Sequence, residues 1–590
     1  MKIGIEIHQR LEGKKLFCDC GCAIDESETP NITITRRLHP VFSELGEVDE
    51  ASQAEFAKDR VFEYQVFRHN DCLVETDEEP PKTMNGEALR TALAIAMQLN
   101  AVPVGEVHVM RKMVIDGSNT SGFQRTSIVA LGGVLETSKG PVGIPQVAIE
   151  EESAGIVAGG ESRATYRLDR LGIPLIEIST DPDIKDGEHL SEVAQKIGMI
   201  LRASGKVARG LGTIRQDVNV STEGGARVEI KGAQDLKMLP TLVDYEVKRQ
   251  TALVSILLEL RSKSALPLKK HVKDVTELFR GTKAKLIASG IDSGSVVLAQ
   301  KLLFHKGILG RETQPGRRYG TELSDYAKRA GVKGLIHSDE SMEKYGITAD
   351  EFARLEKELE IYAGDAFIMV VAPKAQAEKA IEYAVIRANM DYVPKETRRA
   401  NPDGTSTFMR PLPGRARLYP ETDVPPIPLT PEFLATVEKG ESLEDKKAKL
   451  EKLLNKEMAG RMLKSRNLHL FEKLVEGGAE PMLAATTLED TLVSLRREGV
   501  EFEDAEKTLG ELFAEYKNGA FVKAAIPDIL KGMAKGARVE AVLKVFRLQR
   551  IAGKELEALV AENNGDMKAI MQKYRLQVDP AEVSAILRKK

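Results

Sequence analysis

Short segments in which apolar and polar residues alternate constrain the fold of the first 265 residues more than any other feature. In the segment 3–8, Ile-Gly-Ile-Glu-Ile-His, the strand period of two places three isoleucines on one face and Glu6 with His8 on the other. Four more segments set charged or amide side chains opposite apolar ones: 147–152, 173–179, 213–220 and 227–231. We therefore expect a sheet with one apolar face and one face that carries acids, bases and amides.

The residue types on that second face indicate metal and phosphate chemistry. Carboxylates beside an imidazole suit Mg²⁺ or Mn²⁺, and the phosphates of a substrate then complete the coordination shell. Arg215 and Lys231 would face those phosphates. The alternative for any one segment is an ordinary solvated face decorated with charge. This face differs from an ordinary solvated face, which is rich in Thr and Lys, because it carries a histidine and several carboxylates together with an arginine and a lysine.

Helices are expected between and after the alternating segments. Apolar residues at helical spacing predict helices at 84–99 and 190–201, and a long helix is expected at roughly 240–262. From about 266 the sequence becomes a mixed α/β block, with a buried strand at 365–372 and a helix at 376–389. This block has the character of a self-contained insert.

The rest of the chain divides into a loop-rich stretch and a helical one. Residues 393–427 are rich in Pro, Arg and Gly, and from 431 on nearly every segment has helical periodicity interrupted by glycine. A chain of 590 residues is too long to fold around a single hydrophobic core. We predict that its fold class is α+β. The expected domains are a sheet domain of 1–265 plus 391–430, an inserted α/β domain of 266–390, a helical domain of 431–510 and a helical tail of 511–590.

All four cysteines lie in the first 72 residues: Cys18, Cys20, Cys22 and Cys72. Four thiolates could close a tetrahedral zinc site. The spacing C-x-C-x-C is not the paired C-x₂-C of common zinc knuckles, so buried free thiols are an equal alternative. Three of the cysteines are too close in sequence to pair readily with each other, which favours reduced thiols in a cytoplasmic protein.

Charge is distributed unevenly along the chain although the net charge is only −4. Residues 1–100 hold 11 Lys and Arg against 19 Asp and Glu, whereas residues 521–590 hold 14 against 8. The two ends are expected to have different partners. No stretch approaches the length of uncharged apolar sequence that a membrane span needs, so no membrane partner is expected.

The loop 118–124, Ser-Asn-Thr-Ser-Gly-Phe-Gln, could surround a ligand with hydroxyls, amides and backbone donors. It lacks the spacing of a phosphate-binding P-loop, and on its own composition a plain surface loop is favoured. Ser121 is nevertheless counted among the candidate phosphate-binding residues.

Taken in order, eight motifs resemble the cradle-shaped catalytic domain of the B/E family of tRNA-dependent amidotransferases. The motifs are GIEIHQRL with KLFCDC (within 3–20), SGFQRT (121–126), IPQVAIEEESAG (144–155), DRLGIPLIEISTDPDI (169–184), GTIRQDVNVS (212–221), RVEIKGAQ (227–234) and VDYEVKRQ (243–250). The insert is similar to the extra domain of bacterial aspartyl-tRNA synthetases. Members of the B branch lack this domain and archaeal members of the E branch carry it, so the resemblance is to the E branch.

The resemblance implies a ligase reaction. ATP phosphorylates the side-chain carboxylate of Glu attached to tRNA(Gln), and ammonia displaces the phosphate to give Gln-tRNA(Gln). By similarity, Mg²⁺ would be held by His8, Glu177 and one of Glu151 and Glu152. The implied catalytic residues are Glu6, His8, Glu177, Asp217 and Glu229, and the implied ATP- and phosphate-binding residues are Arg170, Arg215, Lys231 and Ser121.

The resemblance also implies partners. Ammonia would come from a separate asparaginase-like D subunit in a heterotetramer with two copies of each chain. The basic tail would bind the body of tRNA(Gln) through its phosphates. The alternative is a non-catalytic tRNA-binding adaptor whose sheet holds a structural metal. Glu6 with His8, and Arg215 with Asp217, favour the enzyme, because an adaptor has no need of a metal beside phosphate-binding cations.

Overall fold

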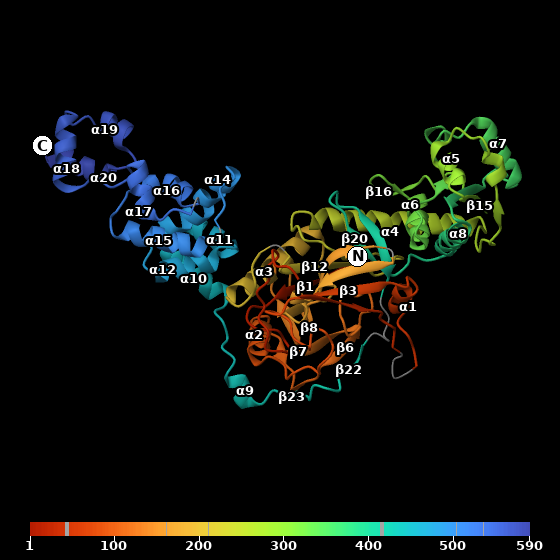
Figure 1. Cartoon of the computed structure of the whole chain (residues 1–590), viewed down its shortest axis with the longest axis horizontal. Coiled ribbons are helices and arrows are strands. Elements are labelled where there is room, and N and C mark those ends of the chain that lie inside the picture. The colour runs from red at the N-terminus through yellow and green to blue at the C-terminus, as the bar shows by residue number, and fades with distance from the viewer. Residues whose placement is uncertain are drawn as a thin grey trace. The chain divides into compact units, whose positions relative to one another are not determined.

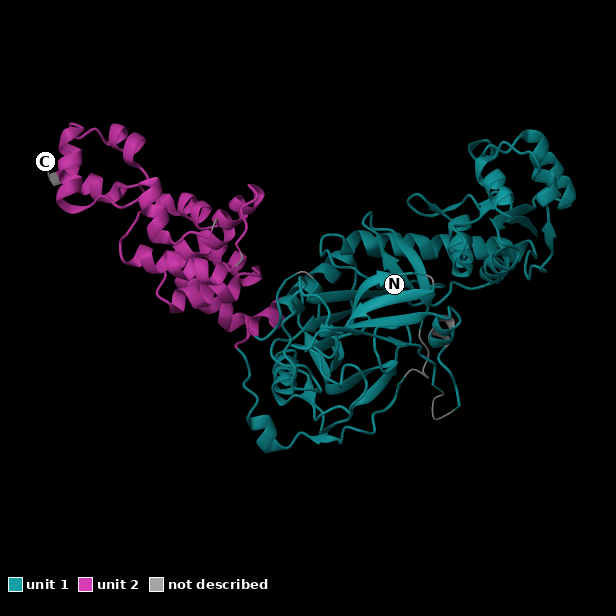
Figure 2. Ribbon diagram, viewed as in Figure 1, with its two compact units in different colours: residues 1–198, 206–440 teal, residues 199–205, 441–590 magenta. Residues whose placement is uncertain are grey.

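The computed structural model describes residues 1–41, 46–160, 162–210, 212–412, 418–502, 504–534 and 536–589. They form two compact units, one of residues 1–198 with 206–440 and one of residues 199–205 with 441–590 (Figure 2). The first unit is mixed α/β and the second is helical. The division into four domains stays a prediction. Among the helices of the described residues, none is long and apolar enough to cross a membrane.

The main sheet of the first unit contains eleven of the described strands (Figure 1). The strand order is β21-β20-β13-β12-β1-β11-β8-β7-β6-β22, and β4 pairs with β7. Its strands are β1 (Lys2–Arg10), β4 (Val102–Pro103), β6 (Met110–Met113), β7 (Phe123–Leu135), β8 (Val142–Glu151), β11 (Pro174–Ser179), β12 (Ile214–Ser221), β13 (Val228–Lys231), β20 (Glu396–Ala400), β21 (Ser406–Pro411) and β22 (Leu418–Pro420). The sheet is mixed because β13 and β20 run parallel.

Strand β1 lies between β11 and β12 and is antiparallel to both. Ile3, Ile5 and Ile7 are at most 1% exposed, whereas Glu6 and His8 on the opposite face are half-buried. This confirms the alternation expected from the sequence.

The predicted helices of this unit are confirmed within a few residues at their ends. Helix α2 (Gly86–Gln98) begins at Asn85, whose side chain accepts from two backbone N–H groups. It packs against β7 and β8. Helices α3 (Gly187–Ala203) and α4 (Leu239–Ser262) follow, and α4 packs against β12. The unit also contains α1 (Glu50–Phe56), α9 (Pro431–Ala435), the pair β5 (Glu106–Val107) and β23 (Ile427–Pro428), and a second sheet of β2 (Ile32–Arg36), β3 (Val61–Val66), β9 (Gly155–Gly159) and β10 (Arg163–Arg167).

The expectation of a merely loop-rich stretch at 393–427 is wrong. Strands β20 and β21 lie in it and extend the main sheet beyond β13. Strand β20 reads Glu-Thr-Arg-Arg-Ala, yet Glu396, Thr397 and Arg398 are fully buried. A buried strand made of paired charges has no apolar alternation, which is the signal that indicates strands in a sequence.

The block 266–390 has its own sheet, which is buried on both faces. Residues Ile368 and Val370 of the strand β19 pack into one core, and Phe367 and Met369 pack into another. The expected strand and helix are confirmed as β19 and α8. The elements of the block are β14 (Val272–Asp274), α5 (Lys285–Asp292), β15 (Val296–Leu302), β16 (Glu312–Gln314), β17 (Arg317–Arg318), α6 (Tyr319–Ala327), β18 (Ile336–His337), α7 (Ala349–Glu358), β19 (Ala366–Ala372) and α8 (Lys374–Ala388).

The second unit is built of helices around one large core and a smaller one. The large core runs from Leu450 to Leu548, and the smaller from Leu556 to Val583. The helices are α10 (Leu443–Leu453), α11 (Lys456–Lys464), α12 (Leu468–Glu476), α13 (Pro481–Thr486), α14 (Leu492–Arg497), α15 (Ala505–Lys517), α16 (Ile526–Met533), α17 (Val539–Phe546), α18 (Gly553–Glu562), α19 (Met567–Tyr574) and α20 (Pro580–Lys589).

Candidate active site on the polar face of the main sheet

The polar face of the main sheet brings His8 together with two carboxylates. In the strand register His8 lies opposite Glu177 of β11. Its Nε2 atom is 3.3 Å from Glu177 Oε2 and 3.4 Å from Glu150 Oε1. The ligand atoms of the three residues all lie within 4.8 Å of one another. We name these three residues the His8 triad.

Lys112 of β6 completes the charge balance of the His8 triad. Its ammonium group is 2.7 Å from Glu150 and 3.7 Å from Glu177. Burial opposes the charged form of Glu177, but Lys112 and His8 outweigh it and hold the pKa of Glu177 well below its usual range. Burial likewise opposes protonation of His8, but the contacts with Glu177 and Glu150 raise the pKa of His8 to about 9.

A second cluster of carboxylates lies beside the triad along β1 and β12. Glu6 is opposite Asp217, and Asp217 is opposite Lys231 of β13. Lys231 Nζ is 2.5 Å from Asp217 and 3.1 Å from Glu229, and Asn219 donates to Glu6 at 3.1 Å. Burial and the charges of Glu177 and Glu229 raise the pKa of Glu6. We name Glu6, Asp217, Glu229 and Lys231 the acidic cluster.

Three arginines converge on one buried carboxylate at the other end of β1. Glu152 is fully buried and lies 2.5 Å from Arg10 Nε, 3.0 Å from Arg170 and 2.6 Å from Arg215. Burial opposes ionisation of Glu152, but the three guanidinium groups lower its pKa. One anion among three cations leaves an excess of positive charge, and we name these four residues the arginine cluster.

These positions correct the metal ligands expected from the sequence. Glu150, and neither Glu151 nor Glu152, lies with His8 and Glu177. Glu152 holds the arginines instead. Glu151 is buried beside Arg125, whose backbone N–H donates to it at 3.1 Å and whose guanidinium lies 3.3 Å away.

The loop with Ser121 is not a plain surface loop, because Asn119 and Thr120 in it are buried. Thr120 donates to the backbone of Glu75 at 2.7 Å. The Ser121 hydroxyl donates to the carbonyl of Phe123 at 3.0 Å and lines a small cavity with Glu151. None of these contacts involves the arginine cluster or Lys231, and a phosphate role for Ser121 stays a prediction.

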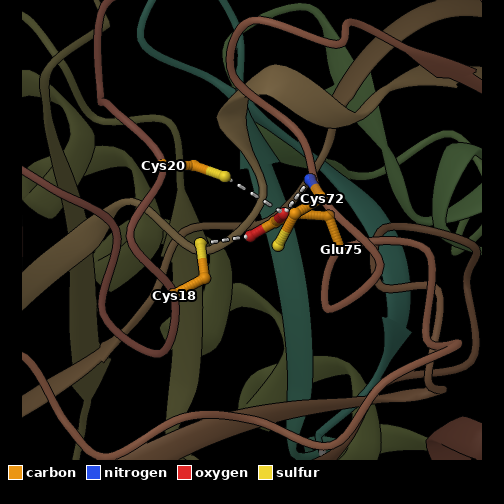
Figure 3. A group of neighbouring side chains, drawn as sticks. All are labelled: Cys18, Cys20, Cys72 and Glu75. Carbon is orange, nitrogen blue, oxygen red and sulfur yellow. Dashed lines mark hydrogen bonds between the residues drawn. The ribbon is translucent and has the colours of Figure 1, made fainter.

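Three of the four cysteines gather around Glu75 (Figure 3). Cys18 Sγ donates to Glu75 Oε1 at 2.9 Å, and the backbone N–H of Cys72 donates to Oε2 at 2.8 Å. Cys20 also lies within the group, whereas Cys22 does not. The expected set of four thiolates is therefore corrected to three thiols and one carboxylate. Burial and the charge of Glu75 raise the pKa of Cys72 to about 12.

Four members of this face were not predicted from the sequence: Arg10, Lys112, Glu150 and Thr397. For Arg10 and Glu150 a signal was present, because one more step of the strand period places each of them on the polar face. Lys112 lies in a strand of four residues with no clear alternation. Thr397 lies in the charged strand β20, where no signal was present.

The donors of two clusters fit metal ions. One imidazole nitrogen and two carboxylates in the His8 triad match the preferences of Mg²⁺ or Mn²⁺. The cysteine group offers sulfur donors that suit Zn²⁺. In the acidic cluster the Lys231 ammonium already neutralises two carboxylates.

Comparison with known proteins identifies the family of the chain. The sequence model of the family described as the GatB/GatE catalytic domain matches residues 1–435 of this chain. The E subunit of the glutamyl-tRNA(Gln) amidotransferase of Pyrococcus furiosus is 46% identical, over 95% of this chain and 90% of its own length. The E subunits of the same enzyme from Methanocaldococcus jannaschii and Archaeoglobus fulgidus are each 43% identical over 100% of this chain, and the alignments cover 98% and 97% of those proteins. All residues of the three clusters lie inside the matched domain, and the chain belongs to the GatB/GatE family.

Proposed function

We propose that this chain catalyses the ATP-dependent conversion of Glu-tRNA(Gln) to Gln-tRNA(Gln). The observation that carries the proposal is the order of side chains along β1. Arg10, His8 and Glu6 follow one another on one face, and each belongs to a different cluster. Phosphate binding, metal binding and carboxylate chemistry would thereby lie side by side, as transfer of a phosphoryl group to a carboxylate requires.

The arginine cluster would bind the phosphates of ATP. Guanidinium groups match phosphate oxygens in geometry and keep their charge at any physiological pH. Glu152 holds the three guanidinium groups at fixed positions, so little reorganisation is needed when the anion arrives. Because Glu152 neutralises only one of the three charges, the site retains a net attraction for phosphate.

The His8 triad would hold Mg²⁺ next to these phosphates. The bound ion supplies charge neutralisation for the phosphoryl group as it moves to the glutamyl carboxylate. The triad residues would fix its place, while Lys112 pairs with both carboxylates and, with His8, holds the pKa of Glu177 well below its usual range.

The acidic cluster would serve the amidation. When ammonia attacks the acyl phosphate, the C–O bond to phosphate breaks and the nitrogen must lose a proton. Glu6, whose pKa is raised by burial and by the charges of Glu177 and Glu229, is a stronger base than an ordinary carboxylate and suits a group that accepts this proton. Asp217 and Glu229 would attract ammonium to the site, while Lys231 limits their net charge.

The proposal includes partners and domains. Ammonia would be supplied by an asparaginase-like D subunit in a heterotetramer, since the relatives are themselves named as E subunits of an amidotransferase. The block 266–390 would be the aspartyl-tRNA-synthetase-like insert in a cradle-like sheet domain. The helical tail would bind the tRNA body, and the three thiols with Glu75 would hold one structural Zn²⁺.

The test compares His8→Ala and Glu150→Gln with the control Glu12→Gln, which changes an exposed carboxylate just after β1. We expect the first two to lower Gln-tRNA formation by at least about 100-fold, because each removes a metal donor. Binding of Glu-tRNA(Gln) should stay within about twofold, since metal ligation does not hold the tRNA body. Unchanged turnover in His8→Ala would support the adaptor with a structural metal instead.

A further inference from the structure

The strand β20 touches the acidic cluster on one face. Thr397 lies opposite Glu229 in the parallel register of β13 and β20. Its hydroxyl donates to Glu229 Oε2 at 2.8 Å, and its side chain is fully buried. Glu229 Oε1 lies 3.1 Å from Lys231, so each oxygen of this carboxylate has one partner.

On the other face of β20, two charged side chains of the strand join four buried charged side chains of other elements, and we name these six residues the buried ion cluster. Its members are Glu246 and Arg249 of α4, Glu322 of α6, Arg387 of α8, and Glu396 and Arg398 of β20. Arg249 contacts Glu322 through two bonds of 2.8 Å and Glu396 through one of 2.5 Å. The insert thus supplies two of the six members.

This cluster fixes the register of β20. Buried ion pairs stabilise a fold no better than well-packed apolar residues do, and their best-attested use is to specify one arrangement. A slip of β20 by one residue would turn Thr397 away from Glu229 and leave Glu396 and Arg398 on the wrong face. Such a slip would leave buried charges without partners, which is prohibitive. Tyr326 of the insert adds a further bond to Glu396 at 3.2 Å.

We propose that Thr397 is a positioning residue for Glu229 and that the insert, through the buried ion cluster, holds it there. Without the hydroxyl, one oxygen of Glu229 loses its partner, and the carboxylate is free to turn toward Lys231. The insert then has a part in the amidation site although none of its residues reaches that site. This inference rests on the proposed function, because it assigns Glu229 to the reaction.

The first test replaces Thr397 with Val, which keeps the shape and removes the hydroxyl, and with Ser, which keeps the hydroxyl. We expect Thr397→Val to lower kcat for Gln-tRNA formation about tenfold, the value of one hydrogen bond to a charged group. The KM values for ATP and Glu-tRNA(Gln) should stay within about twofold, and Thr397→Ser should recover most of the rate. Thr33→Val, an exposed position on β2, is the control for the same change elsewhere in a strand.

The proposal is overturned if Thr397→Val keeps the wild-type kcat or if Thr397→Ser is as slow as Thr397→Val. Glu229→Gln separates this failure from failure of the proposed function. A slow Glu229→Gln with a normal Thr397→Val rejects only the positioning role. A normal Glu229→Gln rejects the assignment of Glu229 itself.

The second test asks whether the insert acts through Thr397. Arg387→Met removes one cation of the buried ion cluster on the insert, and it should lower kcat. If Arg387 acts only by holding β20, the double variant with Thr397→Val should be no slower than Thr397→Val alone. Losses that multiply in the double variant would overturn the coupling through β20. Thermal unfolding of each variant identifies any that fail to fold.

Discussion

At the scale of single residues, the protonation state of His8 decides whether the His8 triad can bind a metal ion. The contacts with Glu177 and Glu150 raise the pKa of His8 to about 9, so the imidazole is protonated at pH 7 in the metal-free protein. A metal ligand must be the neutral imidazole. The two carboxylates therefore hold a proton that the proposed metal ion would have to displace.

This predicts that metal binding releases a proton. At pH 7, about one proton should leave per Mn²⁺ bound, and the affinity should rise as the pH rises toward 9, because the proton competes with the ion below that pH. Calorimetric titration in two buffers of different ionisation enthalpy measures the release. His8→Gln, which has no proton to lose there, should show none, and equal release from wild type and His8→Gln would contradict the assignment.

The residues of the site show what a sequence can and cannot predict. The strand period of two correctly predicts which side chains lie on the polar face: Glu6, His8, Glu177, Asp217 and Glu229. The same rule adds Glu150 to the candidates, because Val147 and Ile149 face the apolar side and Glu150 therefore faces the polar side, whereas motif similarity alone pointed to Glu151 and Glu152. The convergence of Arg10, Arg170 and Arg215 on one carboxylate joins four distant segments, and no local pattern contains it.

At the scale of elements, the loops that carry the cysteines form one compact group with Glu75. The thiols of Cys18 and Cys72 are protonated in the metal-free protein, because burial raises the pKa values of both. Zinc would replace these protons and join the segment 18–20 to the segment 72–75. Glu75 could not be predicted as a member of this group, because the C-x-C-x-C spacing indicates Cys22 as a ligand instead.

We predict about one Zn²⁺ per chain, the number that one such group can hold. Cys72→Ser should lose the zinc and lower the midpoint of thermal unfolding, whereas Cys22→Ser, the matched control outside the group, should keep it. Elemental analysis of the purified proteins measures the zinc content. Zinc lost equally from both variants, or absent from the wild type, would contradict the prediction.

The elements also show why β20 could not be predicted. Helices α2 and α3 have apolar residues at helical spacing and strand β19 is a continuous apolar run, and these elements are predicted from the sequence together with α4 and α8. In β20 the buried side chains are ions and a hydroxyl, and the ions have partners on α4 and α6. Partners so distant in sequence leave no local pattern, so only the three-dimensional structure reveals the strand.

At the scale of the whole molecule, the charge gradient fits the proposal that the two ends have different tasks. The acidic first hundred residues contribute to the metal and carboxylate clusters, and the basic last seventy suit the phosphates of an RNA. The large core of the second unit continues across residue 511, with Leu450, Leu512 and Phe521 in one cluster. A deletion that tests RNA binding should therefore remove residues 441–590 as a unit.

We predict that this deletion raises the KM for Glu-tRNA(Gln) at least about tenfold and leaves the KM for ATP within about twofold, because phosphate contacts dominate RNA affinity. Steady-state kinetics with the ammonia-supplying partner present measures both values. The effect on tRNA should weaken as salt is added, because salt already suppresses the wild-type contacts. Equal increases in both KM values would show that the second unit is not the RNA-binding part.

The central claim is that the glutamyl side chain is activated as an acyl phosphate on this sheet. The most direct measurement uses Glu-tRNA(Gln) labelled with ¹⁸O in both side-chain carboxylate oxygens, with ATP and an ammonia source. Because the C–O bond breaks when ammonia attacks, we predict one ¹⁸O atom in each phosphate released, in step with Gln-tRNA formation. Glu150→Gln should form neither product. Gln-tRNA formed together with unlabelled phosphate would contradict activation as an acyl phosphate.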